Sequence, residues 1–224
     1  MTKDFVSATD AATKRLRAAR IVPVIVIDDP NDAVPLARAL VAGGLSCVEI
    51  TFRTARAAEA ISRITAEVPD VLVGAGTVLS PALAATAWDA GARFIVAPGF
   101  NPRVVDSCIE HGMPVYPGVC TPTELEAALE KGLRTLKFFP AEPSGGLAFL
   151  KAMAAPYGDV SYMPTGGVNL ANVASYLAYN RVVACGGSWM APNDWIAAKQ
   201  FDRIRDESRR ATEVAHGRTP GVLV

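Results

Sequence analysis

Helix-start and helix-end signals recur along this chain at intervals of about twenty residues. A side chain that can cap a helix stands directly before a proline, which is favoured at the first helical position, at Asp29-Pro30, Ser80-Pro81, Asn101-Pro102 and Thr121-Pro122. Glycines that can end a helix follow at Gly91, Gly112 and Gly132. The caps at 80, 101 and 121 and these glycines both advance by 21 and then 20 residues. One strand and one helix fill such a period, so the chain is predicted to repeat a β/α unit.

Short apolar runs alternate with helix-length segments rich in Ala and Leu. The eight runs begin at Ile21, Leu45, Val71, Arg93, Pro114, Leu133, Val160 and Arg181. Strands that alternate with helices pair in parallel through right-handed crossovers, and eight such units predict an α/β fold of the (β/α)8 TIM barrel type. A doubly wound open sheet is the alternative, but no G-x-G-x-x-G follows the first strand.

The 224 residues are predicted to form one domain, residues 1–224. Residues 1–20 are expected to contain an extra N-terminal helix that closes the bottom of the barrel. A last helix is expected from about Pro192 to Ala215, with RIRDESRR on its solvated face. Residues 216–224 form a tail with no period.

Charge and composition exclude several classes of protein. The 22 Lys and Arg residues balance the 22 Asp and Glu residues, so no nucleic-acid or membrane-surface partner is expected. The polar N-terminus has no secretory signal pattern and no stretch of eighteen apolar residues occurs, which predicts a cytoplasmic protein. Four widely spaced cysteines and only two histidines predict free thiols, no metal site and no cofactor.

The second and sixth runs carry charged residues where strand alternation directs them inward. In VEITFRT, Ile50 and Phe52 face the helices, so Glu49, Thr51 and Arg53 share the opposite, interior face. By the same count, Lys137 in TLKFF points into the barrel. A buried structural ion pair is one interpretation. Three inward charges near the carboxyl ends of strands favour a functional site instead, because barrels place their chemistry at that end.

A buried lysine among apolar groups favours nucleophilic catalysis. Loss of solvation and a nearby Arg⁺ both disfavour the ammonium form, and a neutral amine attacks carbonyl groups to give a Schiff base. The iminium then acts as an electron sink while a neighbouring C–C bond breaks. Such a reaction needs an acid/base, which suits Glu49, and Arg53 offers a bidentate fork for a substrate carboxylate.

Glycine-rich turns follow the last two runs, as PTGGVN from Pro164 and CGGSW from Cys185. The loops after strands seven and eight hold phosphate in many barrels, and their exposed N–H groups bind anions. We therefore predict phosphate binding by Gly166, Gly167, Gly187 and Ser188, although tight βα turns alone would also explain the glycines. Thr77, just after GAG, is interpreted either as a turn residue or as a substrate contact.

Several motifs together resemble a known family. VEITFRT, VGAGTVL, APGFNP, PGVCTPTE, LKFFPAE, PTGGVN and GGSW occur in this order between Ile21 and Trp189. They are similar to the motifs of the class I 2-keto-3-deoxy-6-phosphogluconate (KDPG) aldolases, a family that also includes 4-hydroxy-2-oxoglutarate (KHG) aldolases. The residues Phe52 and Cys120 depart from the family's motifs, but neither is at a proposed catalytic position.

The resemblance implies a role for each site residue. Lys137 would form the Schiff base with pyruvate, Glu49 would be the general acid/base, and Arg53 and Thr77 would contact the pyruvyl carboxylate. Gly166, Gly167 and Ser188 would hold the phosphate. Gly187 remains in the predicted phosphate site, and Pro98, Phe139 and Thr165, which stand near the carboxyl ends of predicted strands, are assigned to the substrate pocket. A homotrimer is also implied, with pyruvate and a phosphorylated aldehyde as the small-molecule partners.

The sequence leaves two other functions open. Another phosphate-binding barrel enzyme, such as a thiamine-phosphate synthase or a ribulose-phosphate epimerase, would share the glycine turns but would not need an inward lysine beside an inward glutamate. A non-catalytic phosphosugar-binding module would use the phosphate site alone. The sequence does not rank KDPG against KHG or the galactonate epimer of KDPG as substrate.

Overall fold

Strands and helices alternate along residues 2–218, the part of the chain that the computed structural model describes. The elements are α1 (Lys3–Ala19), β1 (Ile21–Ile25), the 3₁₀ turn η1 (Pro30–Asp32), α2 (Ala33–Ala42), β2 (Cys47–Thr51), α3 (Ala57–Glu67), β3 (Leu72–Gly76), α4 (Pro81–Asp89), β4 (Ile95–Val96), α5 (Pro102–Glu110), β5 (Val115–Tyr116), β6 (Gly118–Val119), α6 (Pro122–Glu130), β7 (Thr135–Phe138), α7 (Gly146–Ala154), β8 (Ser161–Pro164), α8 (Val173–Leu177), β9 (Cys185–Gly187), α9 (Asn193–Ala197) and α10 (Phe201–Ala215). Most of the predicted tail, residues 219–224, lies outside the described residues. Within residues 2–218, no helix is long and apolar enough to cross a membrane.

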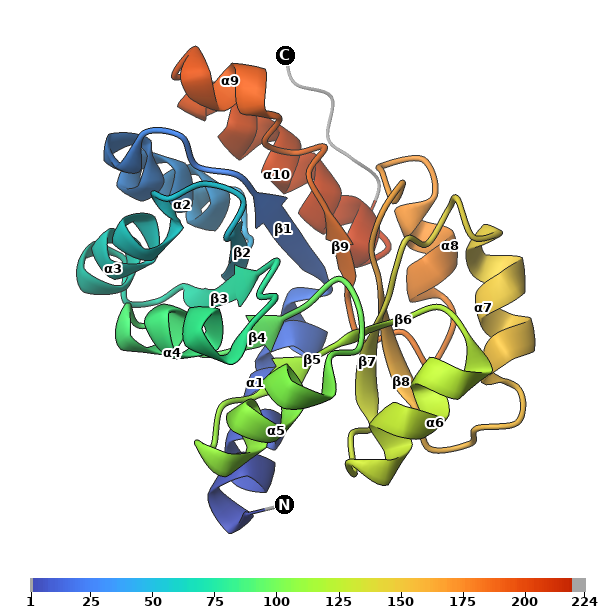
Figure 1. The fold of residues 1–224 in the computed structure, drawn as a ribbon. Coiled ribbons are helices and arrows are strands. Elements are labelled where there is room, and N and C mark those ends of the chain that lie inside the picture. Colours follow the sequence, from blue (N-terminus) through green and yellow to red (C-terminus); the bar gives the residue numbers. More distant parts are fainter. Residues whose placement is uncertain (1, 219–224) are drawn as a thin grey trace.

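The strands form curled parallel sheets with helices on their outer side (Figure 1). A six-stranded sheet has the order β5-β4-β3-β2-β1-β9, and a three-stranded sheet has the order β6-β7-β8. Isolated parallel bridges, Tyr162 to Val182 and Thr165 to Gly186, join the β8 segment to the β9 segment. The predicted α/β fold with parallel strands is therefore confirmed.

The predicted strand from Pro114 is divided in two at Pro117. Strand β5 pairs with β4, whereas β6 pairs with β7. Proline has no N–H to donate to a neighbouring strand, so the hydrogen-bonded ladder stops there. The Pro117 carbonyl still accepts a hydrogen bond from the Lys137 N–H at 3.0 Å.

Alternate strand residues enter two separate hydrophobic clusters. On β2, Val48 and Ile50 belong to the cluster between sheet and helices, while Cys47 belongs to an interior cluster. On β7, Leu136 and Phe138 both lie in the outer cluster. This two-residue period is the alternation of a strand, and it leaves Glu49 and Lys137 on the interior side as predicted.

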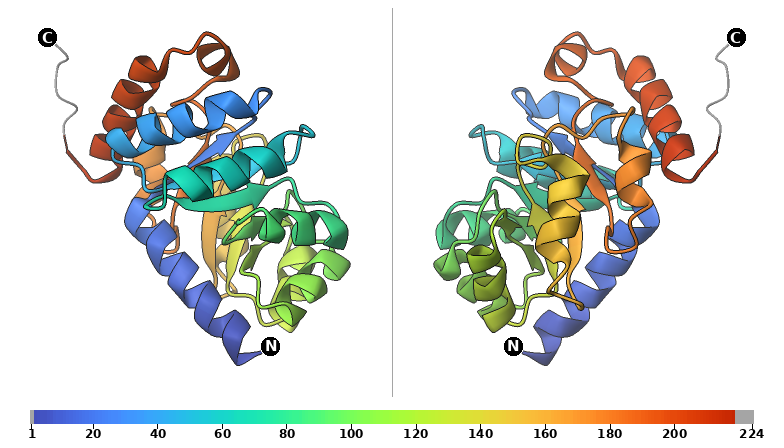
Figure 2. Two further views of the ribbon diagram at one scale, coloured as in Figure 1. Left: turned by 90° about the vertical axis from the view of Figure 1, so that its left-hand side faces the viewer. Right: turned by 90° about the vertical axis from the view of Figure 1, so that its right-hand side faces the viewer.

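Helix α1 covers the amino ends of the strands. Its Leu16 and Ala19 are buried in the interior cluster with Cys47 and Phe94, and Thr13 Oγ1 lies 2.9 Å from the hydroxyl of Tyr116. Figures 1 and 2 show α1 running beneath the sheet, away from the turns at the carboxyl ends. The predicted N-terminal helix is confirmed, and it closes the amino end of the interior.

The predicted helix boundaries rest on local hydrogen bonds that the structure contains. Ser80, Asn101 and Thr121 cap α4, α5 and α6, and Thr121 with Glu124 forms a complete capping box. Asp29 caps η1 instead of a longer helix. The three glycines expected to end helices, Gly91, Gly112 and Gly132, have positive φ values of 106°, 70° and 79°. Capping and turn chemistry were thus readable from the sequence.

The predicted last helix is two helices, so its continuous form was wrong. Between α9 and α10, Lys199 has a left-handed φ of 56° and its N–H bonds to the Ile196 carbonyl. Such a break usually has glycine at the left-handed position, and here a lysine occupies it without a local signal. Lys199 Nζ lies 3.3 Å from the carboxylate of the buried Asp32, and these two residues are 167 positions apart in the sequence.

All four cysteines are free, and three are buried. Burial raises the pKa of the Cys47 and Cys108 thiols to about 12, and raises that of Cys185 as well. Cys120 is half-buried, and its Sγ donates to Ser144 Oγ at 3.1 Å. The expected free thiols are confirmed.

Candidate active site

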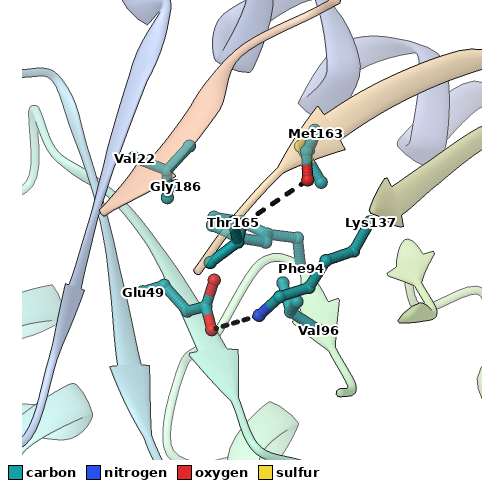
Figure 3. A pocket seen from close by; sticks show the side chains of 8 residues that line it. All are labelled: Val22, Glu49, Phe94, Val96, Lys137, Met163, Thr165 and Gly186. Atoms are coloured by element: carbon teal, nitrogen blue, oxygen red, sulfur yellow. Dashed lines mark hydrogen bonds and ion pairs between the residues drawn. The ribbon is translucent and has the colours of Figure 1, made fainter. Parts of the chain in front are cut away.

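A lysine and a glutamate face each other across the interior, near the carboxyl ends of two strands. Lys137 Nζ lies 3.5 Å from Glu49 Oε1, and their side chains are only 7% and 4% exposed. Figure 3 shows both side chains pointing into the same pocket. Desolvation of two charges is costly, so this pair is poor evidence for stability and better evidence for chemistry.

Neighbouring strands set the position of each member of the pair. Glu49 on β2 pairs in register with Val24 on β1 and Gly74 on β3. Lys137 on β7 pairs with Gly118 on β6 and Met163 on β8. Both side chains therefore extend from regular backbone, which holds reacting groups more accurately than loops do.

Gly76 makes room for the Glu49 carboxylate, a requirement that the sequence analysis missed. A Cβ added at Gly76 would lie 2.0 Å from Glu49 Oε1. Within residues 2–218, that oxygen is buried and accepts no hydrogen bond, although it faces the lysine. It is therefore available to accept a proton or to bond a substrate hydroxyl.

The remaining walls of the pocket are mostly apolar. Lining residues besides the pair are Val22, Phe94, Val96, Met163, Thr165 and Gly186. Thr165, which the sequence predicted to contact the substrate, is buried there. The ring centroid of Phe139, also predicted, lies 5.2 Å from Lys137 Nζ. The pocket thus combines an amine, a carboxylate and a low-polarity surrounding, which strengthens interactions between charges.

Arg53 does not share this buried position, so the expectation of three inward charges was wrong. Strand β2 ends at Thr51, and Arg53 lies exposed on the following turn. Strand alternation ceases to apply once the chain leaves the sheet. Inward-facing Thr51 is buried, but its hydroxyl donates to the Ile25 carbonyl at 2.9 Å and is occupied structurally.

Two further predicted residues lie just beyond neighbouring strands at this edge. Thr77 follows β3 directly, is half-buried, and has a left-handed φ of 56°, which is unfavourable for a β-branched residue. Pro98 follows β4 and is half-buried. Gly118 lies against it, since an added Cβ there would lie 2.1 Å from the Pro98 carbonyl oxygen.

The turn after β8 presents amide groups at the same edge. Gly166 and Gly167 have φ values of 96° and 84°, which other residues rarely adopt. The Gly166 carbonyl accepts from the Glu142 N–H, and the Gly167 carbonyl accepts from the side-chain amides of Asn169 and Asn172. The N–H groups of both glycines donate no hydrogen bond identified among the described residues.

The two glycine turns lie side by side. The bridge between Thr165 and Gly186 aligns the residues just before them, so Gly166–Gly167 neighbours Gly187 and Ser188. Gly187 is buried and ends β9, while Ser188 is exposed. Unpaired amides with an exposed hydroxyl form a surface suited to an anion.

The fold and the site together define a class of protein: a parallel α/β protein with a buried lysine–glutamate pair and, beside it, a glycine-rich edge suited to an anion. Comparison with known proteins narrows the class. Residues 12–206 match the family model described as "Aldolase: KDPG and KHG aldolase". The chain belongs to the KDPG and KHG aldolase family.

Individual relatives agree with this assignment. The 2-dehydro-3-deoxy-phosphogluconate aldolase of Treponema pallidum is 52% identical over 89% of this chain and 95% of its own. The KDPG aldolase of Legionella pneumophila, solved with pyruvate captured as a covalent carbinolamine, superposes with a TM-score of 0.86 at 37% identity, over 89% and 97% of the chains. The 2-keto-3-deoxy-6-phosphogluconate aldolase of Zymomonas mobilis, solved with 3-phosphoglycerate, superposes with a TM-score of 0.85 at 38% identity. The match covers 91% of this chain and 96% of that chain.

Proposed function

We propose that this protein is a class I aldolase that reversibly cleaves KDPG to pyruvate and glyceraldehyde 3-phosphate through a Schiff base on Lys137. The observation that carries the proposal is the buried pair of Lys137 and Glu49, with 3.5 Å between Nζ and Oε1. It agrees with the curated relatives, which are named for this reaction. Since the family also includes KHG aldolases, we propose cleavage of 4-hydroxy-2-oxoglutarate to pyruvate and glyoxylate as a second activity.

Schiff-base formation starts with a proton transfer inside the pair. Moving one proton from Lys137 Nζ to Glu49 Oε1 gives a neutral amine and a neutral acid, which removes two charges from a buried site. The amine attacks the C2 carbonyl of the substrate to give a carbinolamine. Glu49 returns its proton as the hydroxyl leaves as water, and the iminium forms.

Cleavage then uses the iminium as the electron sink. Glu49, now a carboxylate, accepts the proton of the C4 hydroxyl, and the C3–C4 bond breaks as glyceraldehyde 3-phosphate departs. The electron pair is held as an enamine. Glu49 gives the proton it accepted to C3, which becomes the pyruvate methyl group, and Glu49 is again a carboxylate. Water adds to the resulting iminium and releases pyruvate and the free lysine. The steps balance without a metal or an added cofactor.

The other predicted residues bind the two ends of the substrate. We assign the pyruvyl carboxylate to Thr77 and Arg53, whose guanidinium forms none of the ion pairs identified within residues 2–218. Pro98, Phe139 and Thr165 would line the pocket. The phosphate is assigned to Gly166, Gly167, Gly187 and Ser188, which is supported by the unpaired amides of the first two.

Trapping with borohydride tests the mechanism. The parent protein incubated with pyruvate and sodium borohydride should gain the mass of one reduced pyruvate adduct, and peptide mapping should place it on Lys137. Lys137→Met should form no adduct and lose KDPG cleavage, whereas the exposed Lys151→Met serves as the matched control and keeps both. An unchanged mass in the parent protein would refute the Schiff base and leave a phosphosugar-binding module as the better interpretation.

We also propose that the strands close into one (β/α)8 barrel within a single domain, residues 1–224. Taking β5 and β6 as one strand interrupted at Pro117 leaves eight strands, and the bridges between the β8 and β9 segments support closure on the other side. Hydrogen exchange checks this proposal: the Val183 N–H, which donates to the Tyr162 carbonyl at 2.9 Å, should be protected to the same degree as amides of β1.

The family resemblance further supports a cytoplasmic homotrimer, which we propose as the working assembly. Light scattering during size-exclusion chromatography should then give three times the chain mass of 23.6 kDa. A monomer at micromolar concentration would contradict this assembly without affecting the proposed chemistry.

A further inference from the structure

A glutamate and a tyrosine outside the reacting pair meet beside the Gly166–Gly167 turn. The Tyr176 hydroxyl, on α8, donates a hydrogen bond to Glu142 Oε1, on the turn after β7. The Tyr176 side chain is buried, whereas Glu142 is exposed. An exposed carboxylate is usually free to rotate in solvent, so its bond to a buried donor 34 positions away indicates a defined orientation.

Glu142 holds the turn through its backbone as well as its side chain. The Glu142 N–H donates to the Gly166 carbonyl at 2.9 Å, next to a bond of 2.8 Å from the Ala141 N–H to the Thr165 carbonyl. A Cβ added at Gly167 would lie 2.5 Å from Glu142 Cβ and 2.7 Å from its Cγ. The glycine backbone therefore lies directly against the Glu142 side chain.

The start of α7 packs closely against the pair. A Cβ added at Gly146, the first residue of α7, would lie 3.0 Å from Glu142 Oε1 and 3.4 Å from the Tyr176 hydroxyl. Burial, with a smaller contribution from the Glu142 hydrogen bond, raises the pKa of Tyr176. The hydroxyl remains a protonated donor at neutral pH.

The orientation of the negatively charged Glu142 side chain affects how well the Gly166–Gly167 turn can bind an anion. The N–H groups of Gly166 and Gly167 donate no hydrogen bond identified within residues 2–218 and suit an anion, and a carboxylate next to them would repel it. Since Tyr176 directs the Glu142 carboxylate toward α8, the negative charge is fixed and partly satisfied by a donor. Without that donor, the carboxylate would turn into solvent and toward an incoming phosphate.

We propose that Glu142 and Tyr176 are positioning residues for the phosphate end of the substrate: their hydrogen bond holds the Gly166–Gly167 turn open to an anion and keeps the Glu142 charge away from it. This rests on the proposed function for the identity of the substrate. The anion-binding part depends only on the geometry of the turn. The pair selects for phosphorylated substrates without touching the reacting atoms.

Tyr176→Phe separates this role from a general structural one. We expect KM for KDPG to rise about tenfold, as for loss of a hydrogen bond to a charged group, with kcat changed less than twofold. KM for the unphosphorylated 4-hydroxy-2-oxoglutarate should stay the same. Glu142→Gln, whose amide oxygen still accepts from Tyr176 but carries no charge, should leave KM for KDPG unchanged or lower it.

Tyr157→Phe is the matched control, because the Tyr157 hydroxyl donates to Glu126 Oε1 at 2.7 Å in a similar tyrosine–glutamate pair on the surface. It should leave every constant unchanged. Equal rises in KM for both substrates in Tyr176→Phe, or no rise in either, would overturn the proposal. Glu142→Leu provides a second variant should Tyr176→Phe fold poorly. It removes the hydrogen bond and the charge together, so KM should rise for KDPG alone but by less than in Tyr176→Phe, and an equal rise for both substrates would again overturn the proposal.

Binding of inorganic phosphate, titrated calorimetrically, gives a readout that does not depend on turnover. The affinity should fall about tenfold in Tyr176→Phe and stay within twofold in Tyr157→Phe. If the parent cleaves no KDPG, the proposed function fails, but loss of phosphate affinity in Tyr176→Phe alone would still support the positioning role. Equal phosphate affinity in all three proteins would overturn it even if KDPG cleavage is confirmed.

Discussion

The two ends of the strand interior are built from the same alternating positions but hold opposite kinds of side chain. At the amino end, Leu16 of α1 packs with Cys47 and Phe94 in a buried apolar cluster. Two residues further along β2, at Glu49, the same interior face carries a carboxylate opposite Lys137. One end is closed by a helix and the other is bordered by glycine turns. Substitutions at the amino end are therefore expected to alter stability, and substitutions at the carboxyl end are expected to alter the chemistry.

The largest effect is expected from Glu49→Gln at the carboxyl end. The amide cannot accept the substrate proton, so kcat/KM for KDPG should fall about 10²- to 10⁴-fold, while borohydride trapping of pyruvate on Lys137 is partly retained. Exchange of the pyruvate methyl protons in D₂O should slow in parallel. Glu126→Gln on the surface is the control. Full activity in Glu49→Gln would remove this residue from the acid/base role.

At the amino end, Leu16→Ala should lower the free energy of unfolding by about 2–5 kcal/mol, because it leaves a cavity in a fully buried cluster. Urea denaturation measures this loss, and kcat of the folded enzyme should be unchanged. Val6→Ala, on the exposed side of the same helix, should cost under about 0.5 kcal/mol. A large loss of kcat in Leu16→Ala with unchanged stability would break the division between the two ends.

The smallest effect near neutral pH is a dependence on alkaline pH at the amino end, which is absent below pH 9 and amounts to about 1.4 kcal/mol at pH 10. Burial raises the pKa of Cys47 from 9.0 to about 12, so between these values the folded state keeps a proton that the unfolded state releases. The contribution of this thiol to the free energy of unfolding is fully present below pH 9. It is lost as the pH rises toward 12, by about 1.4 kcal/mol per pH unit. Urea unfolding of Cys47→Ala should show a shallower decline above pH 9. Below pH 8 its difference from the parent should be constant, and equal slopes above pH 9 would contradict the assignment.

Much of the candidate site could be predicted because it follows from local rules. Strand alternation identified Glu49 and Lys137 as inward-facing from their apolar neighbours alone, and capping residues marked the helix starts. The same rule failed for Arg53, since alternation holds only as far as the sheet continues and β2 ends at Thr51. Likewise, no local signal marked the helix break at Lys199.

The sequence by itself determined the repeated β/α unit, the face of each strand and the family, because hydrophobic period, caps and motifs are properties of short segments. Only the tertiary structure decided the 3.5 Å approach of Lys137 to Glu49, the space that Gly76 leaves for the carboxylate, and the bond from Tyr176 to Glu142. Those contacts join residues 27 to 88 positions apart. They depend on how strands and turns are placed against one another, which no single segment specifies.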